Sequence, residues 1–426
     1  MSNYTAPVDG VHMHLENKKM GKLFFWFLWL MYMLVYMTKY CFSSALAPIV
    51  ESGVLTKTQT GIIAASFHVV YAPLQILGGM FADRYNPERM IKIGLLGSAV
   101  ANLVIFINQN FYVMLFSWMF NAAIQFALWP SVFKIMASQL PRSEKPKNIF
   151  LLSLSPSAGL LVAFVIAGLL PRWQLNFAVS ALVLLGLFIA MHFVCKKVDR
   201  FMLPDRETLM ENIREKDSRG FTLMKLMLTS GLIFLVGVTF LRTMIGQGAQ
   251  TLAPTMLMET YDGISASIGN ILNIVVIACG ISGTFFIRLL LSKKIIKNEI
   301  VGVIVTMAIM VPMSVILCML GKVPYYMIIV AMSVIALCST AGTYLVSAYN
   351  SKFAAFGKDG TIAGIVNCAG SAALIVQTYG FQALADTYGW IAVSNLWVVL
   401  SVITTVLAII ALPIYIKFRK NHNDIL

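Results

Sequence analysis

The chain has 426 residues, of which 59% are hydrophobic and only 12% are charged. Soluble globular proteins carry about 25% charged residues, so this composition excludes a water-soluble enzyme, and it also excludes disordered, collagen-like and disulfide-stabilised proteins. The net charge of +14 would suggest a nucleic-acid partner in a soluble chain, so the positions of the charges must decide what it means here.

Twelve apolar runs follow one another along the chain, each long enough to cross a bilayer, which takes about 20 helical residues. Within hydrocarbon, such a run satisfies its backbone hydrogen bonds only as a helix, and the alternating segments typical of membrane barrels are missing from the sequence. The sequence therefore predicts an all-α membrane protein with twelve transmembrane helices in two pseudo-symmetric six-helix halves. The runs lie at about residues 23–47, 58–82, 89–108, 112–138, 148–169, 176–195, 226–257, 265–291, 300–320, 325–350, 362–385 and 390–416.

The charged segments between these runs predict the domain organisation. The first apolar run is too long for a cleaved signal peptide and is expected to stay as an anchor. In the linker between the halves, the sequence from Pro204 to Glu215 predicts a short helix. The expected parts are an N-terminal cytoplasmic tail (1–22), a six-helix bundle (23–195), a cytoplasmic linker (196–225), a second six-helix bundle (226–416) and a cytoplasmic C-terminal tail (417–426).

Both termini are predicted to lie in the cytoplasm. In that orientation the inner segments hold 26 of the 32 lysines and arginines, and the outer loops hold only Lys57, Arg172 and Lys322. This imbalance is the positive-inside pattern of multi-pass membrane proteins. A basic inner face explains the net charge, so we expect a lipid bilayer and no nucleic acid among the partners.

A short internal repeat relates the two halves. The first apolar run ends in Leu46-Ala47-Pro48 and the seventh ends in Leu252-Ala253-Pro254, and an acidic residue, Glu51 or Glu259, follows each. Transporters built from repeats bind their substrate near the middle of the membrane, between the repeats. The repeat therefore favours a transporter with a central substrate site.

Three cations lie more than three residues inside the apolar runs, whereas all 18 acidic residues fall in the predicted loops. A charge in hydrocarbon costs several kcal/mol, so each of these cations requires an explanation. Lys134 lies near the cytoplasmic end of its helix and is expected to extend to the interface. Lys39 and Arg242 lie near the middle of the equivalent first and seventh helices. Their predicted partner is an anionic substrate; the alternatives are hydrogen bonds to helix carbonyls or a gating contact between the halves.

Polar side chains recur at helical spacing on the same and neighbouring helices, as expected for the lining of a binding site. Similar stripes also form hydrogen bonds between helices, and a single histidine such as His68 is more often a packed residue than a proton carrier. The predicted substrate-binding residues are Lys39, Arg242, Tyr36, Tyr71, Gln75, His68, Asn121, Gln125, Gln250 and Asn367.

Other chemistries lack their sequence signatures. There is no Walker-type phosphate loop, no His-Glu-x-x-His motif and no Cys-x-x-Cys pair among the six cysteines. A hydrolase inside the membrane would need a carboxylate beside its serine and histidine, and the apolar runs contain none. We therefore expect no enzyme activity, no cofactor and no bound metal.

The segment Gly79-x-x-x-Asp83-Arg84-x-x-x-x-Arg89 resembles the signature loop of the major facilitator superfamily. The resemblance implies the twelve-helix fold and a role in locking the cytoplasmic gate for Asp83, Arg84 and Arg89. Several stretches are more similar to the organophosphate:phosphate antiporter family within it. These are Tyr36-x-x-Lys39-x-x-Phe42-x-x-Ala45, Val50-Glu51-x-Gly53, Tyr71 through Asp83-Arg84-x-Asn86-Pro87, Trp129-Pro130 and Gly360-Thr361-x-Ala363-Gly364.

The chain departs from that family at four positions. The arginine of the family's first helix corresponds to Lys39, and the lysine of its second helix corresponds to Gln75. The histidine of its fifth helix falls near Pro156. The arginine of its seventh helix falls at Gly246, one turn after Arg242.

These observations together predict a secondary active transporter that moves a small organic anion, an organophosphate or a carboxylate, by alternating access. It is expected to act as an antiporter or a proton-coupled symporter, with a coupling ion or counter-anion, as a monomer in the bacterial inner membrane. Two alternatives stay open. One is an exporter of amphipathic or lipid-like compounds, and the other is a non-transporting membrane sensor of an anionic metabolite.

Overall fold

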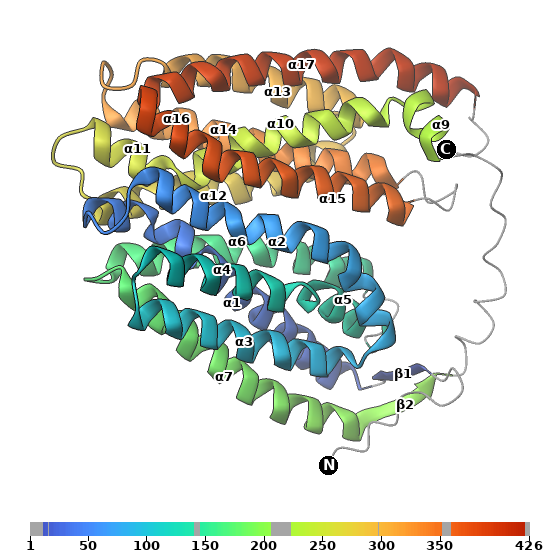
Figure 1. Cartoon of the computed structure of the whole chain (residues 1–426). Coiled ribbons are helices and arrows are strands. Elements are labelled where there is room, and N and C mark those ends of the chain that lie inside the picture. The colour runs from blue at the N-terminus through green and yellow to red at the C-terminus, as the bar shows by residue number, and fades with distance from the viewer. Residues whose placement is uncertain are drawn as a thin grey trace. The chain divides into compact units, whose positions relative to one another are not determined.

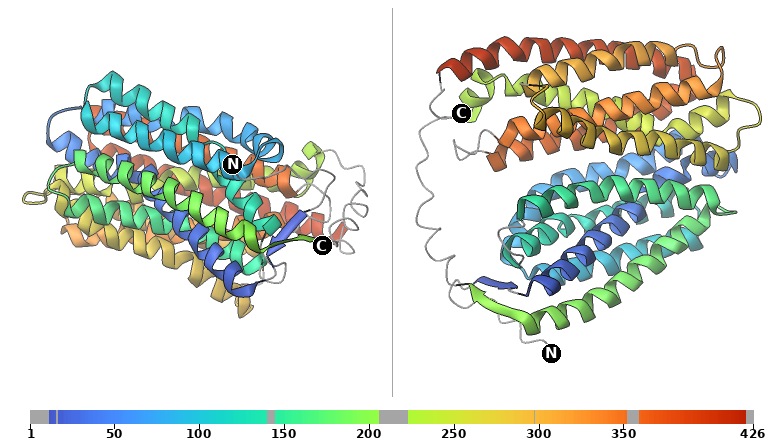
Figure 2. Two further views of the ribbon diagram at one scale, coloured as in Figure 1. Left: turned by 90° about the horizontal axis from the view of Figure 1, so that it is seen from below. Right: turned by 180° about the vertical axis from the view of Figure 1, so that it is seen from behind.

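Helices make up almost all of the described chain (Figures 1 and 2). A computed structural model of the protein describes residues 12–15, 17–139, 145–205, 223–296, 298–351 and 359–421. Contacts group the chain into two units. Unit 1 consists of residues 1–42, 69–166 and 170–216, and unit 2 consists of residues 43–68, 167–169 and 217–426. Helices α1, α2 and α6 each contribute residues to both units.

Unit 1 is built around the contacts of α3 with α4, α5 and α7. Its core contains large apolar side chains without exposed surface, among them Phe24, Leu28 and Ile91. The α3 helix begins with Asn86, whose side chain accepts hydrogen bonds from the backbone N–H groups of Glu88 and Arg89, as helix-capping residues do. The helices of this part of the chain are α1 (Lys18–Glu51), α2 (Lys57–Arg84), α3 (Pro87–Ile107), α4 (Phe111–Gln125), α5 (Leu128–Gln139), α6 (Lys145–Leu169) and α7 (Gln174–Val198).

A two-stranded ribbon lies at one end of unit 1 (Figure 1). Strand β1 (His12–Leu15) pairs antiparallel with β2 (Met202–Asp205), which follows α7 and the short 3₁₀ helix η2 (Asp199–Phe201). Leu15 is fully buried in the core of unit 1. The helix predicted from Pro204 to Glu215 is therefore wrong at its start, because Pro204 belongs to a strand of a two-stranded ribbon, where proline is tolerated. Residues 206–215 lie outside the described residues.

Unit 2 has α14 at its centre, packed against α10, α12 and α13. Two-thirds of the apolar window in α14 is buried, so this helix has little surface left for lipid. The helices are α9 (Leu223–Thr229), α10 (Leu232–Thr251), α11 (Ala253–Thr260), α12 (Ala266–Ser292), α13 (Glu299–Leu317), α14 (Tyr325–Ser351), α15 (Asp359–Ile375), the π-helical η4 (Val376–Gly380), α16 (Phe381–Tyr388) and α17 (Trp390–Asn421).

The helices coincide with the predicted apolar runs. Within the described residues, nine helices are long and apolar enough to span a membrane. The runs at 58–82, 148–169 and 362–385 correspond to α2, α6 and the series α15–η4–α16. The predicted all-α fold of twelve transmembrane helices is confirmed, with the β1–β2 ribbon as a small addition.

Several acidic residues lie in the end turns of helices, and the prediction that they occupy loops is wrong for these positions. The reason is that the helices continue beyond the apolar runs, since a backbone outside the hydrocarbon keeps its helical hydrogen bonds. Glu88 in the first turn of α3 is also favoured by the positive end of the helix dipole. The residues concerned are Glu51, Asp83, Glu88, Glu259, Glu299, Asp359 and Asp386.

The first proline of the internal repeat, Pro48, lies within α1. Proline has no N–H, so the carbonyl of Ser44, four residues earlier, lacks its usual helical donor. The side chain of Asn270, which is fully buried on α12, donates a hydrogen bond of 3.0 Å to this carbonyl. The contact ties the end of α1 to α12 inside unit 2.

The second proline of the repeat, Pro254, lies in the first turn of α11, just after the break between α10 and α11. The carbonyl that loses its donor here belongs to Gln250, and the side chain of Asn273 donates to it at 2.8 Å. Asn270 and Asn273 are three residues apart on α12. One helix therefore supplies the missing donor at both prolines of the repeat.

Candidate functional site

Arg242 lies on α10 with only 4% of its surface exposed. Its Nη1 group donates to the backbone carbonyl of Ser339 at 2.7 Å and to the hydroxyl of Thr343 at 2.6 Å, both on α14. A longer contact of 3.3 Å joins Nη1 to the Ser339 hydroxyl. One end of the guanidinium group is thus held firmly by the neighbouring helix.

The other edge of the guanidinium group is less occupied. Within the described part of the chain, Nε is buried without a hydrogen-bond partner, and Nη2 has one marginal contact of 3.5 Å with the hydroxyl of Thr243. Among the described residues, no carboxylate lies within ion-pairing distance of Arg242. The contacts with α14 satisfy hydrogen bonds, but they leave the positive charge without a counter-charge in this part of the chain.

Two glycines allow α10 and α14 to approach this closely. A Cβ atom at Gly246 would overlap the side chain of Ser339, and a Cβ atom at Gly342 would lie 2.8 Å from Cδ of Arg242. Real Cβ atoms do not tolerate such contacts, so glycine is required at both positions for the observed geometry.

Lys39 lies half-buried on α1, next to two tyrosine rings. Its Nζ atom lies 4.0 Å from the ring centre of Tyr71 on α2 and 5.1 Å from that of Tyr36 on α1. Cation–π contacts of this kind stabilise an ammonium group by about 0.5–2 kcal/mol. The structure therefore brings together three of the predicted binding residues inside unit 1.

Two further predicted residues of unit 1, Asn121 and Gln125, are buried on α4 and bond to each other. Gln125 Nε2 donates to Asn121 Oδ1 at 2.9 Å, while Asn121 Nδ2 has no partner among the residues that the structure describes. Each amide thus takes part in a hydrogen bond within its own helix, whereas the alternative role expected for such stripes is a hydrogen bond between helices.

The remaining predicted residues of unit 2 lie in three different environments. Gln250 is buried, and its side chain donates to the carbonyl of Gly246 at 3.1 Å on the same helix. Asn367 is exposed on α15. His68 is half-buried on α2, with its ring centre 5.6 Å from that of Phe67.

Of the predicted gating residues, Arg89 is exposed in the first turn of α3. Gln75, Asp83 and Arg84 belong to α2, but their side chains lie outside the described residues, as does that of Lys134.

An ionic cluster, which the sequence analysis did not predict, joins the beginning of α2 to the C-terminal helices of unit 2. Lys57 Nζ lies 2.9 Å from Glu259 Oε2 and 3.8 Å from Asp386 Oδ1. Thr58 donates to Asp386 at 2.6 Å, and the indole of Trp390 donates to Glu259 at 2.8 Å. The Lys57 cluster therefore connects α2 with α11, α16 and α17.

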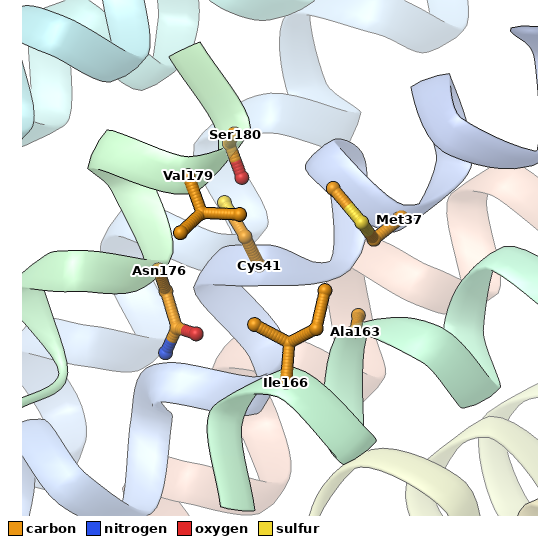
Figure 3. A pocket seen from close by; sticks show the side chains of 7 residues that line it. All are labelled: Met37, Cys41, Ala163, Ile166, Asn176, Val179 and Ser180. Carbon is orange, nitrogen blue, oxygen red and sulfur yellow. The ribbon is translucent and has the colours of Figure 1, made fainter. Parts of the chain in front are cut away.

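A small pocket in unit 1 is lined by residues of α1, α6 and α7, but none of them is a predicted binding residue (Figure 3). The sulfur of Cys41 on α1 points toward Ser180 on α7, and Ile166 lines the pocket from α6. Its lining is mostly apolar and includes no charged side chain. The lining residues are Met37, Cys41, Ala163, Ile166, Asn176, Val179 and Ser180.

Comparison with known families decides the identity. The sequence profile of the Major Facilitator Superfamily matches residues 28–378, which is most of the chain. The chain belongs to the major facilitator superfamily. This superfamily member is therefore a multi-pass membrane protein from a superfamily of transporters, not of enzymes.

Curated relatives of this superfamily member match it over short segments. The membrane sensor protein UhpC of Salmonella typhimurium is 26% identical over 162 residues, 37% of this chain and 37% of the relative. The glycerol-3-phosphate transporter of Bacillus subtilis is 24% identical over 128 residues, 29% of each chain. The matched segments thus cover much less than two-thirds of either relative.

Solved structures match almost the whole chain at low identity. A bacterial homolog of the human lysosomal transporter Spinster, in an inward-facing and occupied conformation, has a TM-score of 0.71 at 14% identity. The match covers 93% of this superfamily member and 96% of that chain. At this identity the likeness shows the fold alone.

The residues that accept hydrogen bonds from Arg242, Ser339 and Thr343, were not among the predicted site residues. Ser339 and Thr343 belong to the tenth apolar run, where a stretch of small and hydroxyl-bearing residues interrupts the larger aliphatic ones. That interruption was the available signal, because small residues mark places where membrane helices pack closely.

Proposed function

We propose that this transporter moves a small organic anion, an organophosphate or a carboxylate, by alternating access, and that Arg242 binds the anionic group. The observation that supports the proposal best is the buried guanidinium group, which has no carboxylate partner among the described residues and an unpartnered Nε. A buried charge without a counter-charge is costly, and a bound anion removes that cost.

Lys39 is the second proposed anion-binding residue, with Tyr36 and Tyr71 around it. Arginine offers a planar fork to a phosphate or carboxylate, whereas lysine offers a compact charge that can follow the ligand. A binding anion lowers the free energy of states in which both cations are dehydrated, which favours the occluded state.

Transport is proposed to be coupled to exchange of another anion or to protons carried with the substrate or by His68. The transporter is proposed to act as a monomer in the bacterial inner membrane with both termini in the cytoplasm. The relative from Bacillus subtilis, named a glycerol-3-phosphate transporter, supports an organophosphate as the first substrate to test.

Counterflow in proteoliposomes tests the proposal. Purified protein is reconstituted with unlabelled anion inside, and uptake of labelled glycerol 3-phosphate, glucose 6-phosphate or succinate is measured. We expect saturable uptake of one anion class, with KM raised about tenfold or more in Arg242→Gln and Lys39→Gln, because a hydrogen-bonded charge contributes about 1.5–3 kcal/mol.

Lys322→Gln is the matched control, since Lys322 is an exposed loop residue of unit 2 with the same charge. It is expected to transport like the wild type. Movement of amphipathic compounds without any dependence on anions, or unchanged anion uptake in Arg242→Gln, contradicts the proposal.

A second candidate function is a membrane sensor of an anionic metabolite, which is favoured by the relative named a membrane sensor protein. A sensor binds its ligand without moving it. Thermal stabilisation by an anion, lost in Arg242→Gln, together with no counterflow of that anion, would support the sensor over the transporter.

A further inference from the structure

We infer that Ser339 and Thr343 are positioning residues that orient Arg242 so that its Nε–Nη2 edge receives two oxygens of the same oxyanion. This inference rests on the proposed role of Arg242 in anion binding. It adds the orientation of the guanidinium group, and with it a preference for anions that carry two oxygen atoms on one centre.

The division of donors within the guanidinium group supports the inference. Arginine has five N–H groups, two on Nη1, two on Nη2 and one on Nε. The two on Nη1 have acceptors of the protein, the Ser339 carbonyl at 2.7 Å and the Thr343 hydroxyl at 2.6 Å. On the opposite edge, the described residues give Nε no partner and give Nη2 only the 3.5 Å contact with Thr243.

An arginine with a purely structural role would be expected to have strong hydrogen bonds along this edge as well. Buried donors are almost always hydrogen-bonded, and an unpaired buried donor costs free energy. The Nε–Nη2 edge presents two parallel N–H groups, the geometry that pairs with a carboxylate or a phosphate through two hydrogen bonds. One end of Arg242 is thus bound to α14, and the opposite, bidentate edge is the part of the side chain that we assign to the anion.

The anchor is itself fixed. The hydroxyl of Thr343 donates its proton to the carbonyl of Ser339 at 3.1 Å. The lone pairs of the Thr343 oxygen are therefore available to accept the hydrogen bond from Arg242. Gly342 contacts the aliphatic part of Arg242, and Gly246 keeps α10 against Ser339. The side chain of Arg242 therefore has little freedom to turn its edge away.

Thr343→Val removes the anchoring hydroxyl and keeps the shape and volume of the side chain. The probes in the counterflow assay are labelled glycerol 3-phosphate and succinate. Their KM is expected to rise about fivefold, because one hydrogen bond contributes about that factor to an equilibrium constant, and Vmax is expected to stay unchanged. Thr343→Ser keeps the hydroxyl and is expected to restore KM. Thr239→Val is the matched control, since that hydroxyl on α10 bonds to the Leu235 carbonyl of its own helix.

Arg242→Lys provides an independent test should Thr343→Val not fold. It keeps the positive charge and loses the two-donor edge, so KM for both probes is expected to rise about tenfold or more. Unchanged KM in Thr343→Val or in Arg242→Lys, beside a large loss in Arg242→Gln, overturns the inference and leaves the proposed function standing. Unchanged KM in Arg242→Gln overturns both.

Discussion

The hydrogen bond from Asn270 to the Ser44 carbonyl is expected to stabilise the folded protein, because Pro48 removes the N–H donor that a helix normally supplies to this carbonyl. Asn270→Ala deletes a bond of 3.0 Å between buried groups, which contributes about 1 kcal/mol to the free energy of unfolding. In a Pro48→Ala background, residue 48 has an N–H and can donate to Ser44 itself. We therefore expect Asn270→Ala to cost about 1 kcal/mol less in that background.

Unfolding by sodium dodecyl sulfate in mixed micelles, followed by circular dichroism, gives the free energies for this double-mutant cycle. The same cycle for Pro254→Ala and Asn273→Ala is expected to show similar coupling, because Asn273 donates to the Gln250 carbonyl. The crossed cycles, Pro48→Ala with Asn273→Ala and Pro254→Ala with Asn270→Ala, serve as controls and should be additive within about 0.5 kcal/mol. The reasoning is refuted if Asn270→Ala costs the same with and without Pro48.

Two further predictions concern the packing of unit 2. Gly246→Ala is expected to lower the free energy of unfolding by about 1–3 kcal/mol, because the added methyl group overlaps Ser339. The matched control is Gly370→Ala, which has open space around it and should not lower the free energy of unfolding. Equal effects of the two substitutions would contradict the close approach of α10 and α14 at Gly246. Lys57→Gln and Glu259→Gln are expected to show a coupling of about 0.5–1 kcal/mol in the same titration, as a partly exposed ion pair does. That coupling should shrink with added salt, whereas Lys322→Gln and Glu259→Gln should be additive.

The helices and their number follow from the sequence because each apolar run must satisfy its own backbone inside a membrane. The positions of Lys39 and Arg242 within their helices follow from the same runs. The ends of the helices do not, since a helix can continue past the hydrocarbon, as α1 does to Glu51 and α11 does to Thr260. The β1–β2 ribbon was also not predicted, because it joins two four-residue segments that are far apart in the sequence.

The environment of each cation depends on contacts that periodicity within one helix cannot give. Ser339 lies 97 positions after Arg242 in the chain, and only the packing of α10 against α14 brings them together. The link from Lys57 to Glu259 likewise spans 202 positions. The position of Arg242 within an apolar run predicts that its charge requires a partner. The identity of its hydrogen-bond acceptors depends on the tertiary structure.

The close approach at Gly246 links the position of the buried cation to the spacing of α10 and α14. The resemblance to the organophosphate:phosphate antiporters places their seventh-helix arginine at this position, where the chain has room for no side-chain atom because Ser339 fills the space. Gly246→Arg would therefore force α10 and α14 apart and release Arg242 from its anchor. The location of the charge and the spacing of the two helices therefore depend on each other in this chain, because a side chain at residue 246 would occupy the space that Ser339 fills when it accepts from Arg242.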